Sequence, residues 1–173
     1  SLVINQPIEE VIQISITSND DSSVKLLLQD NKWSVANENN FPADSAKISN
    51  FLDSISSLSS RPASAVAVTE GARARFKVSD IEFSKQIKLT NTANITEVLF
   101  LGSSPALDRV HIRKGGENTI FSVKFPTYEA SSSSSNWLDK TILQVPSDSV
   151  IQIRIGETIL ERKVESNIDT AEN

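Results

Sequence analysis

The chain has 173 residues, of which 38% are hydrophobic and 23% charged, and this balance predicts one globular domain with a core of its own. Its net charge of -5 is opposite to the basic field that binds phosphate backbones, so nucleic acid is not an expected partner. The absence of cysteine excludes disulfides and thiolate metal sites, and the longest apolar run, Val98 to Leu101, is far too short to cross a bilayer.

The first predicted elements form an antiparallel meander of three strands. In the first strand isoleucine alternates with glutamine or serine, which is the two-residue period of a strand with one buried face. Short runs of Asn, Asp and Ser separate this strand from the next two and predict turns. The strands are expected at residues 11–16, 24–29 and 32–35.

An amphipathic helix is predicted next, at about residues 44–58. Asp44 or Ser45 can cap the free N–H groups of its first turn. Apolar residues then recur at helical spacing from Ile48 to Leu58 and form one stripe, which predicts a helix that packs on a core. Pro62 cannot donate the hydrogen bond that would continue a helix, so the helix ends before it.

Strands return after this helix. Residues 97–101 are apolar at consecutive positions, which indicates a central strand covered on both faces. Gly115-Gly116 predicts a hairpin turn whose flanking strands share an apolar side. The expected strands are at 66–69, 81–83, 86–89, 97–101, 109–114 and 119–125, and a second short helix is expected at about 136–142. The predicted class is therefore α+β, with mainly antiparallel sheets.

The two ends of the chain suggest that it is part of a longer protein. The sequence contains no methionine, so we expect residues 1–173 to be a single α+β domain excised from a longer chain. The strand at 11–16 recurs at 150–155 with five of six residues unchanged. We interpret residues 150–173 as the start of a following repeat unit, and a chance match of two isoleucine-rich strands is the alternative.

The sequence offers little catalytic chemistry. His111 is the only histidine, and Arg109 and Arg113 flank it on the same strand face, where their charges would disfavour the imidazolium that a general base must form. We therefore predict a solvated strand histidine, no enzymatic activity, and no metal or cofactor site. The same face carries Arg109, His111, Arg113 and Lys124, which form either a binding site for an anionic partner or an ordinary polar sheet face.

Two other features have alternative interpretations. Trp33 and Trp137 are either exposed platforms that stack on sugars or anchors in the core, and their apolar neighbours favour the core. A carbohydrate- or other ligand-binding domain that uses them is the alternative to a protein-binding module. Residues 131–135, a run of five serines, are predicted to be a flexible loop and not a site.

The order of several short motifs resembles a known family. These motifs are Trp33, Pro42-Ala43-Asp44 at the start of the helix, Leu101-Gly102, His111-Ile112-Arg113, and Trp137-Leu138-Asp139-Lys140. Together they resemble the bacterial family catalogued as domain of unknown function 4340, over nearly the whole chain.

The resemblance implies an extracytoplasmic (periplasmic) protein that is anchored to the inner membrane by a segment upstream, with tandem copies of such a domain. It also implies a protein partner in the envelope, such as a component of an ABC-type export or gliding system. No membrane contact is expected from residues 1–173 themselves. The leading hypothesis is a non-catalytic binding or scaffolding module.

Overall fold

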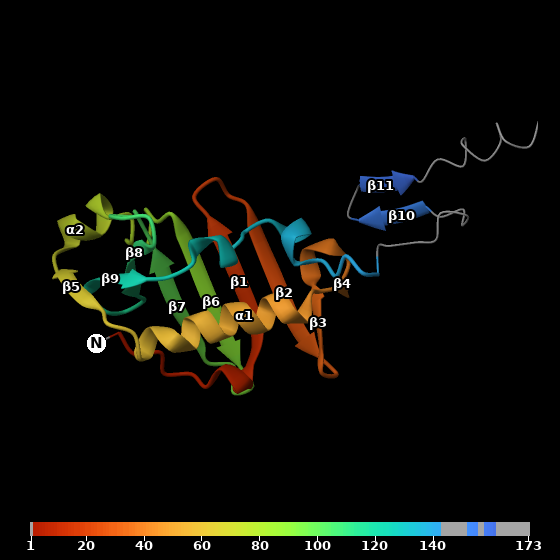
Figure 1. Cartoon of the computed structure of the whole chain (residues 1–173), viewed down its shortest axis with the longest axis horizontal. Helices are drawn as coiled ribbons and strands as arrows, with labels where there is room; N and C mark the ends of the chain where they lie inside the picture. Colours follow the sequence, from red (N-terminus) through yellow and green to blue (C-terminus); the bar gives the residue numbers. More distant parts are fainter. Residues whose placement is uncertain (1, 143–151, 156–157, 162–173) are drawn as a thin grey trace, which may run out of the picture.

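A nine-stranded antiparallel sheet dominates the computed structural model, which describes residues 2–142, 152–155 and 158–161 (Figure 1). The strand order across this sheet is β4-β3-β2-β1-β6-β7-β8-β9-β5. The strands are β1 (Val11–Ser18), β2 (Ser23–Gln29), β3 (Lys32–Val35), β4 (Phe41–Pro42), β5 (Ser64–Ala67), β6 (Lys85–Asn91), β7 (Thr96–Leu101), β8 (Arg109–Lys114) and β9 (Ile120–Lys124). The predicted α+β class is confirmed.

The helices are few. The α-helices are α1 (Ser45–Ser56) and α2 (Glu70–Arg75), and short 3-10 helices lie at Ile8–Glu10, Ala36–Glu38, Ser57–Ser59, Thr127–Glu129 and Ser134–Trp137. Within the described residues, no helix is long and apolar enough to span a membrane.

Helix α1 connects the two edges of the sheet. The chain first builds the predicted three-stranded meander, β1 to β3, and adds β4 at its edge. It then crosses one face of the sheet in α1 and starts again at the far edge with β5 (Figure 1). The later strands fill the space between, so β6 pairs with β1 and β9 pairs with β5. The segments at the two ends of α1 are therefore held at opposite edges of the sheet.

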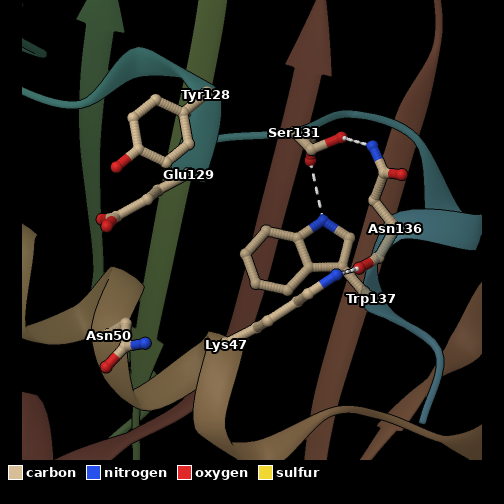
Figure 2. A pocket seen from close by; sticks show the side chains of 7 residues that line it. All are labelled: Lys47, Asn50, Tyr128, Glu129, Ser131, Asn136 and Trp137. Atoms are coloured by element: carbon tan, nitrogen blue, oxygen red, sulfur yellow. Dashed lines mark hydrogen bonds between the residues drawn. The ribbon is translucent and has the colours of Figure 1, made fainter. Parts of the chain in front are cut away.

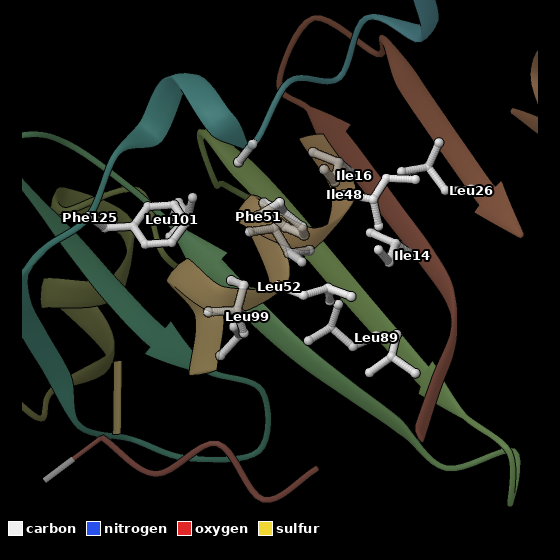
Figure 3. Packing of buried hydrophobic residues seen from close by; sticks show 14 of the residues in the cluster. Ile14, Ile16, Leu26, Ile48, Phe51, Leu52, Leu89, Leu99, Leu101 and Phe125 are labelled. Carbon is white, nitrogen blue, oxygen red and sulfur yellow. The ribbon is translucent and has the colours of Figure 1, made fainter. Parts of the chain in front are cut away.

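The start of α1 agrees with the predicted cap. The Asp44 side chain accepts hydrogen bonds from the backbone N–H groups of Ala46 (3.1 Å) and Lys47 (3.2 Å), which lack partners inside the helix. The predicted apolar stripe is buried and faces the sheet, where isoleucine and leucine side chains of the strands meet it (Figure 3). The stripe comprises Ile48, Phe51, Leu52 and Ile55.

The opposite face of the sheet is covered at the end formed by β7, β8 and β9. Here the chain from Val68 to Ser84, which includes α2, packs its apolar side chains on Phe100 and Ile120. We call residues 68–84 the covering segment. Strand β7 is thus buried on both faces, as the consecutive apolar residues predicted. The strand predicted at 81–83 is wrong: these residues form a turn that is closed by hydrogen bonds between Ser79 and Glu82, with a single bridge between Val78 and Phe83.

The short helix predicted at about 136–142 is also replaced by a different structure. The chain makes a 3-10 turn at Ser134–Trp137 and then becomes extended, so that Leu138 forms a β-bridge with Ala43. The cause is pairing with the segment before α1, because Asp44 N–H donates to the Trp137 carbonyl (2.7 Å) and Asp139 N–H donates to the Pro42 carbonyl (2.9 Å).

Strands β10 (Gln152–Ile155) and β11 (Thr158–Glu161) form a separate two-stranded antiparallel sheet. Strand β10 lies within the segment 150–155 that repeats the strand at 11–16. The interpretation of 150–173 as the start of a repeat depends largely on residues outside this description, and it stays a prediction.

Candidate functional site

A pocket of about 360 Å³ lies between α1 and the chain that follows β9 (Figure 2). This volume is within the range of about 300–1,000 Å³ that is usual for small-molecule sites. Helix α1, the 3-10 turn at Thr127–Glu129 and the serine-rich segment each contribute to its lining. The lining residues are Lys47, Asn50, Tyr128, Glu129, Ser131, Asn136 and Trp137.

Trp137 forms one wall of the pocket and anchors it to the core. Its side chain is 2% exposed and packs edge-on against Phe51 of α1, with ring centroids 5.7 Å apart. The indole N–H donates to the Ser131 carbonyl (2.8 Å), so the polar atom of this buried ring is satisfied. The predicted core position of Trp137 is confirmed, and Trp33 is half-buried against the same core.

Hydrogen bonds fix most of the polar side chains around the pocket. Ser54 Oγ donates to Glu129 Oε2 (2.5 Å), and Lys47 Nζ donates to the Asn136 carbonyl (2.8 Å). The Asn136 amide donates to Ser131 Oγ (2.8 Å). The charged groups of Lys47 and Glu129 are thus held by neutral partners, and the pocket keeps its shape without a ligand.

Several polar groups in the lining have no hydrogen-bond partner within the described residues. Among them are the Asn50 amide, the Tyr128 hydroxyl and the second carboxylate oxygen of Glu129. Figure 2 shows the Tyr128–Glu129 turn on one side of the space, Trp137 on the other with its six-membered ring turned toward the pocket, and Asn50 below them on α1. These groups can bind a polar ligand that also has an apolar surface for an aromatic ring.

Most of this site could not be found from the sequence. The serine run was predicted to be a flexible loop and not a site, but Ser131 lines the pocket. Other serines of the run are tied to distant strands and turns, since Ser132 Oγ contacts Ser22 Oγ (2.6 Å) and Ser134 Oγ donates to Glu38 (2.6 Å). The one useful signal is that the chain contains a single tyrosine, Tyr128.

The basic stripe predicted on β8 and β9 is not an open surface. Arg113 is 1% exposed, because residues 78–80 lie over it. Its guanidinium donates to the carbonyls of Val78 (2.6 Å) and Glu117 (2.9 Å) and forms an ion pair with Asp80 (2.8 Å). Its charge also lies over the Phe100 ring, 4.7 Å from the centroid. Arg113 therefore holds the covering segment on the sheet and is not presented to a partner.

The other two cations of the stripe differ in exposure. Arg109 is half-buried, and its guanidinium donates to the hydroxyl (3.0 Å) and the carbonyl (2.6 Å) of Ser122 on the neighbouring strand. Lys124 is exposed and forms an ion pair with Asp108 (3.0 Å), which also keeps the pKa of that carboxyl below its usual value. Of the four predicted residues, only Lys124 has the exposure that was expected for an open stripe.

The prediction of a solvated His111 is wrong. The side chain is 7% exposed, because Phe76 of the covering segment stacks on it with a centroid distance of 4.2 Å. Nδ1 shares a hydrogen bond with Ser103 Oγ (2.9 Å), and Ser103 Oγ is also within reach of the Phe76 carbonyl (3.4 Å). Ser103 thus joins the loop after β7 to β8 through His111 and to the covering segment through the Phe76 carbonyl.

His111 makes the stability of the domain depend on pH. Burial lowers its pKa below the ordinary value of 6.5, although a hydrogen bond with the Ser103 backbone acts in the opposite direction. As the pH falls below about 6.5, His111 takes up a proton in the unfolded chain before it does so in the folded chain. The stability contributed by neutral His111 is therefore complete above about pH 6.5 and is lost as the pH falls toward the lower folded pKa.

Urea unfolding at pH values of about 7.5 and 5.5 measures this effect. We expect His111→Gln to lose less unfolding free energy between these two values than the unsubstituted chain. Carboxyl groups titrate in both proteins and His111 is the only histidine, so the difference between the two proteins isolates its contribution. Equal losses would contradict a lowered pKa of His111 in the folded state.

The fold and the pocket together define an α+β domain in which an antiparallel sheet and a crossing helix support a small site lined by polar and aromatic side chains. The chain belongs to the family described as a domain of unknown function (DUF4340), which matches residues 33–171. The family indicated by the order of sequence motifs is thereby confirmed. No curated protein and no solved structure matches the chain.

Proposed function

We propose that this chain is a non-catalytic binding or scaffolding module in the extracytoplasmic part of a membrane-anchored bacterial envelope protein. The pocket beside α1 holds a ligand, and other faces of the domain serve protein partners in the envelope, such as a component of an ABC-type export or gliding system. The location and the protein partners rest on the resemblance to the family. The binding role rests on the pocket.

The observation that supports the binding role is that internal hydrogen bonds hold the pocket open while other polar groups of its lining stay free. A site of this kind loses little entropy when a ligand binds, since its side chains are already ordered. In the part of the chain that the structure describes, the lining contains a single carboxylate, Glu129, and Ser54 donates to one of its oxygens. Glycoside hydrolysis commonly uses a pair of carboxyl groups, so this lining suits binding better than that chemistry.

The location can be tested with a single cysteine, because residues 1–173 contain none. Leu107 is fully exposed, so Leu107→Cys in the parent protein gives an accessible thiol. If the domain is extracytoplasmic, a maleimide reagent that cannot cross the inner membrane will label this thiol in intact cells. Ala43→Cys is the matched control at a buried position and should be labelled only after denaturation. Labelling of Leu107→Cys that requires lysis of the inner membrane would place the domain in the cytoplasm.

The binding role is tested by photo-crosslinking in the same parent protein. A benzoylphenylalanine at position 128 replaces an exposed aromatic ring at the edge of the pocket, and one at position 107 serves as an exposed control outside the lining. We expect a discrete adduct from position 128 and none from position 107. The absence of any adduct at position 128 would overturn the pocket as a binding site.

A further inference from the structure

The exposed ring of Tyr128 gives the first indication of what the pocket binds. The side chain is 80% exposed, although the turn that carries it is well ordered by hydrogen bonds. Lys85 Nζ donates to the Ala130 carbonyl (2.6 Å), and Glu129 N–H donates to the Pro126 carbonyl (3.0 Å). The ordered turn therefore presents an exposed aromatic ring at the edge of the pocket, and such a ring can stack on a ligand with a flat apolar side.

The polar groups of the pocket suit a neutral ligand with several hydrogen-bonding groups. Asn50 offers a planar amide that can donate and accept, and the free oxygen of Glu129 accepts. Planar side chains of this kind can pair with adjacent hydroxyl or acetamido groups of a sugar ring. The apolar face of the same ring can then lie on Tyr128.

Other ligand classes fit the lining less well. Among the described residues no aliphatic side chain lines the pocket, so the lining offers no site that would select the apolar side chains of a peptide. A phosphate group would meet the carboxylate of Glu129, and Lys47, the one cation among these lining residues, already donates to the Asn136 carbonyl. The net charge of -5 also opposes a polyanion.

The pattern of donors and acceptors selects among sugars. An acetamido substituent carries one N–H donor, one carbonyl acceptor and a methyl group. The Glu129 oxygen can accept from that N–H, the Asn50 amide can donate to that carbonyl, and the edge of the buried Trp137 ring that lines the pocket gives the methyl group a small apolar wall (Figure 2). A sugar with hydroxyl groups alone leaves this wall without an apolar partner.

We infer that the pocket between α1 and the Thr127–Trp137 segment binds an N-acetylated hexosamine unit of a glycan. Tyr128 stacks on the sugar ring, and Asn50 and Glu129 bind its acetamido group. The inference rests on the proposed binding function and specifies its ligand. The binding role itself does not require the ligand to be a glycan.

An NMR titration of the 15N-labelled chain with triacetylchitotriose tests the inference. We expect progressive shifts of amide signals at residues 47–50 and 128–137, with a Kd of about 0.1–1 mM, as is usual for one small open site. Maltotriose, which has no acetamido groups, should bind at least about tenfold more weakly. Equal binding of the two sugars, shifts located elsewhere, or no shifts at all would overturn the inference.

Substitutions in the pocket supply the second readout. Tyr128→Ala and Asn50→Ala change exposed side chains and should leave the fold intact, which the unchanged spectrum outside the pocket will verify. We expect each to weaken triacetylchitotriose binding about fivefold to twentyfold, from loss of stacking or of hydrogen bonds. Leu107→Ala and Asp53→Ala are matched exposed controls outside the lining and should bind triacetylchitotriose as tightly as the unsubstituted chain does. Pocket variants that bind as tightly as these controls would contradict the assignment.

The crosslinking experiment separates failure of this inference from failure of the proposed function. If triacetylchitotriose does not bind but position 128 gives a discrete protein or peptide adduct, the ligand class is wrong and the binding role stands. If neither experiment gives a positive result, both are wrong.

Discussion

Arg113→Ala is expected to lower the unfolding free energy by about 3 kcal/mol, because it removes a buried side chain that holds the covering segment on the sheet. The substitution leaves the carbonyls of Val78 and Glu117 without their donor and opens a cavity beside Phe100. Urea or thermal unfolding measures the loss, and for a chain of this size the expected fall in Tm is about 6–12 °C.

The control for this prediction is the partner carboxylate. Asp80 is 67% exposed, so its carboxylate keeps most of its hydration in the ion pair with the buried Arg113, and Asp80→Asn should cost less than about 1 kcal/mol. A large effect of Asp80→Asn together with a small effect of Arg113→Ala would mean that the ion pair, and not the bonds to the carbonyls, holds residues 78–80. Equal small effects would contradict the buried position of Arg113.

The parts of the fold that the sequence predicted correctly are those in which burial follows a local period. Alternating isoleucines in β1 face the core at Ile14 and Ile16, and the stripe of α1 faces the same core. The β8–β9 hairpin was predicted correctly as well, with Val110 opposite Val123 and Ile112 opposite Phe121. In each case the residues that face the core are apolar at a regular spacing, so the pattern of residue types is enough to place that face.

The covering segment was not predicted because its residues follow no period. Ile81 is almost fully exposed although it is apolar, and Arg113 is fully buried although it is charged. The burial of Arg113 depends on Val78 and Asp80, which lie 35 and 33 positions earlier in the chain and which only the tertiary structure brings to it. For the same reason the sequence predicted a solvated His111, whose cover is the ring of Phe76.

The candidate site was missed for a related reason. Its lining comes from α1 and from a segment nearly 80 residues later, and the two meet only through tertiary contacts such as the hydrogen bond from Asp44 N–H to the Trp137 carbonyl. Asn, Ser, Glu and Lys are also the residues that any exposed loop contains. Only Trp137 and Tyr128 were distinctive, and the sequence predicted correctly that Trp137 belongs to the core.

Gly102→Ala is the second substitution with a large expected effect, since it acts on the same contact between the covering segment and the sheet. Gly102 follows β7, and a Cβ atom at this position would lie 1.9 Å from the Phe76 carbonyl oxygen and 2.9 Å from that of Lys77. Both atoms belong to the backbone and cannot rotate away. Residues 76–78 must therefore move off the sheet, which also separates Phe76 from His111. We expect the unfolding free energy to fall by about 3 kcal/mol or more.

Gly71→Ala is the matched control, because Gly71 lies in α2 of the same covering segment and no atom comes within 4 Å of an added Cβ. Alanine has the higher helix propensity, so this substitution should be neutral or should raise the unfolding free energy by about 0.5–1 kcal/mol. Urea unfolding compares the two variants directly. If Gly102→Ala unfolds at the same urea concentration as Gly71→Ala, residues 76–78 do not approach the sheet as closely as described. The covering segment would then pack only loosely on the sheet. A large difference between the two variants means that the close packing at Gly102, and not the local conformation of the segment, keeps His111 and Arg113 buried.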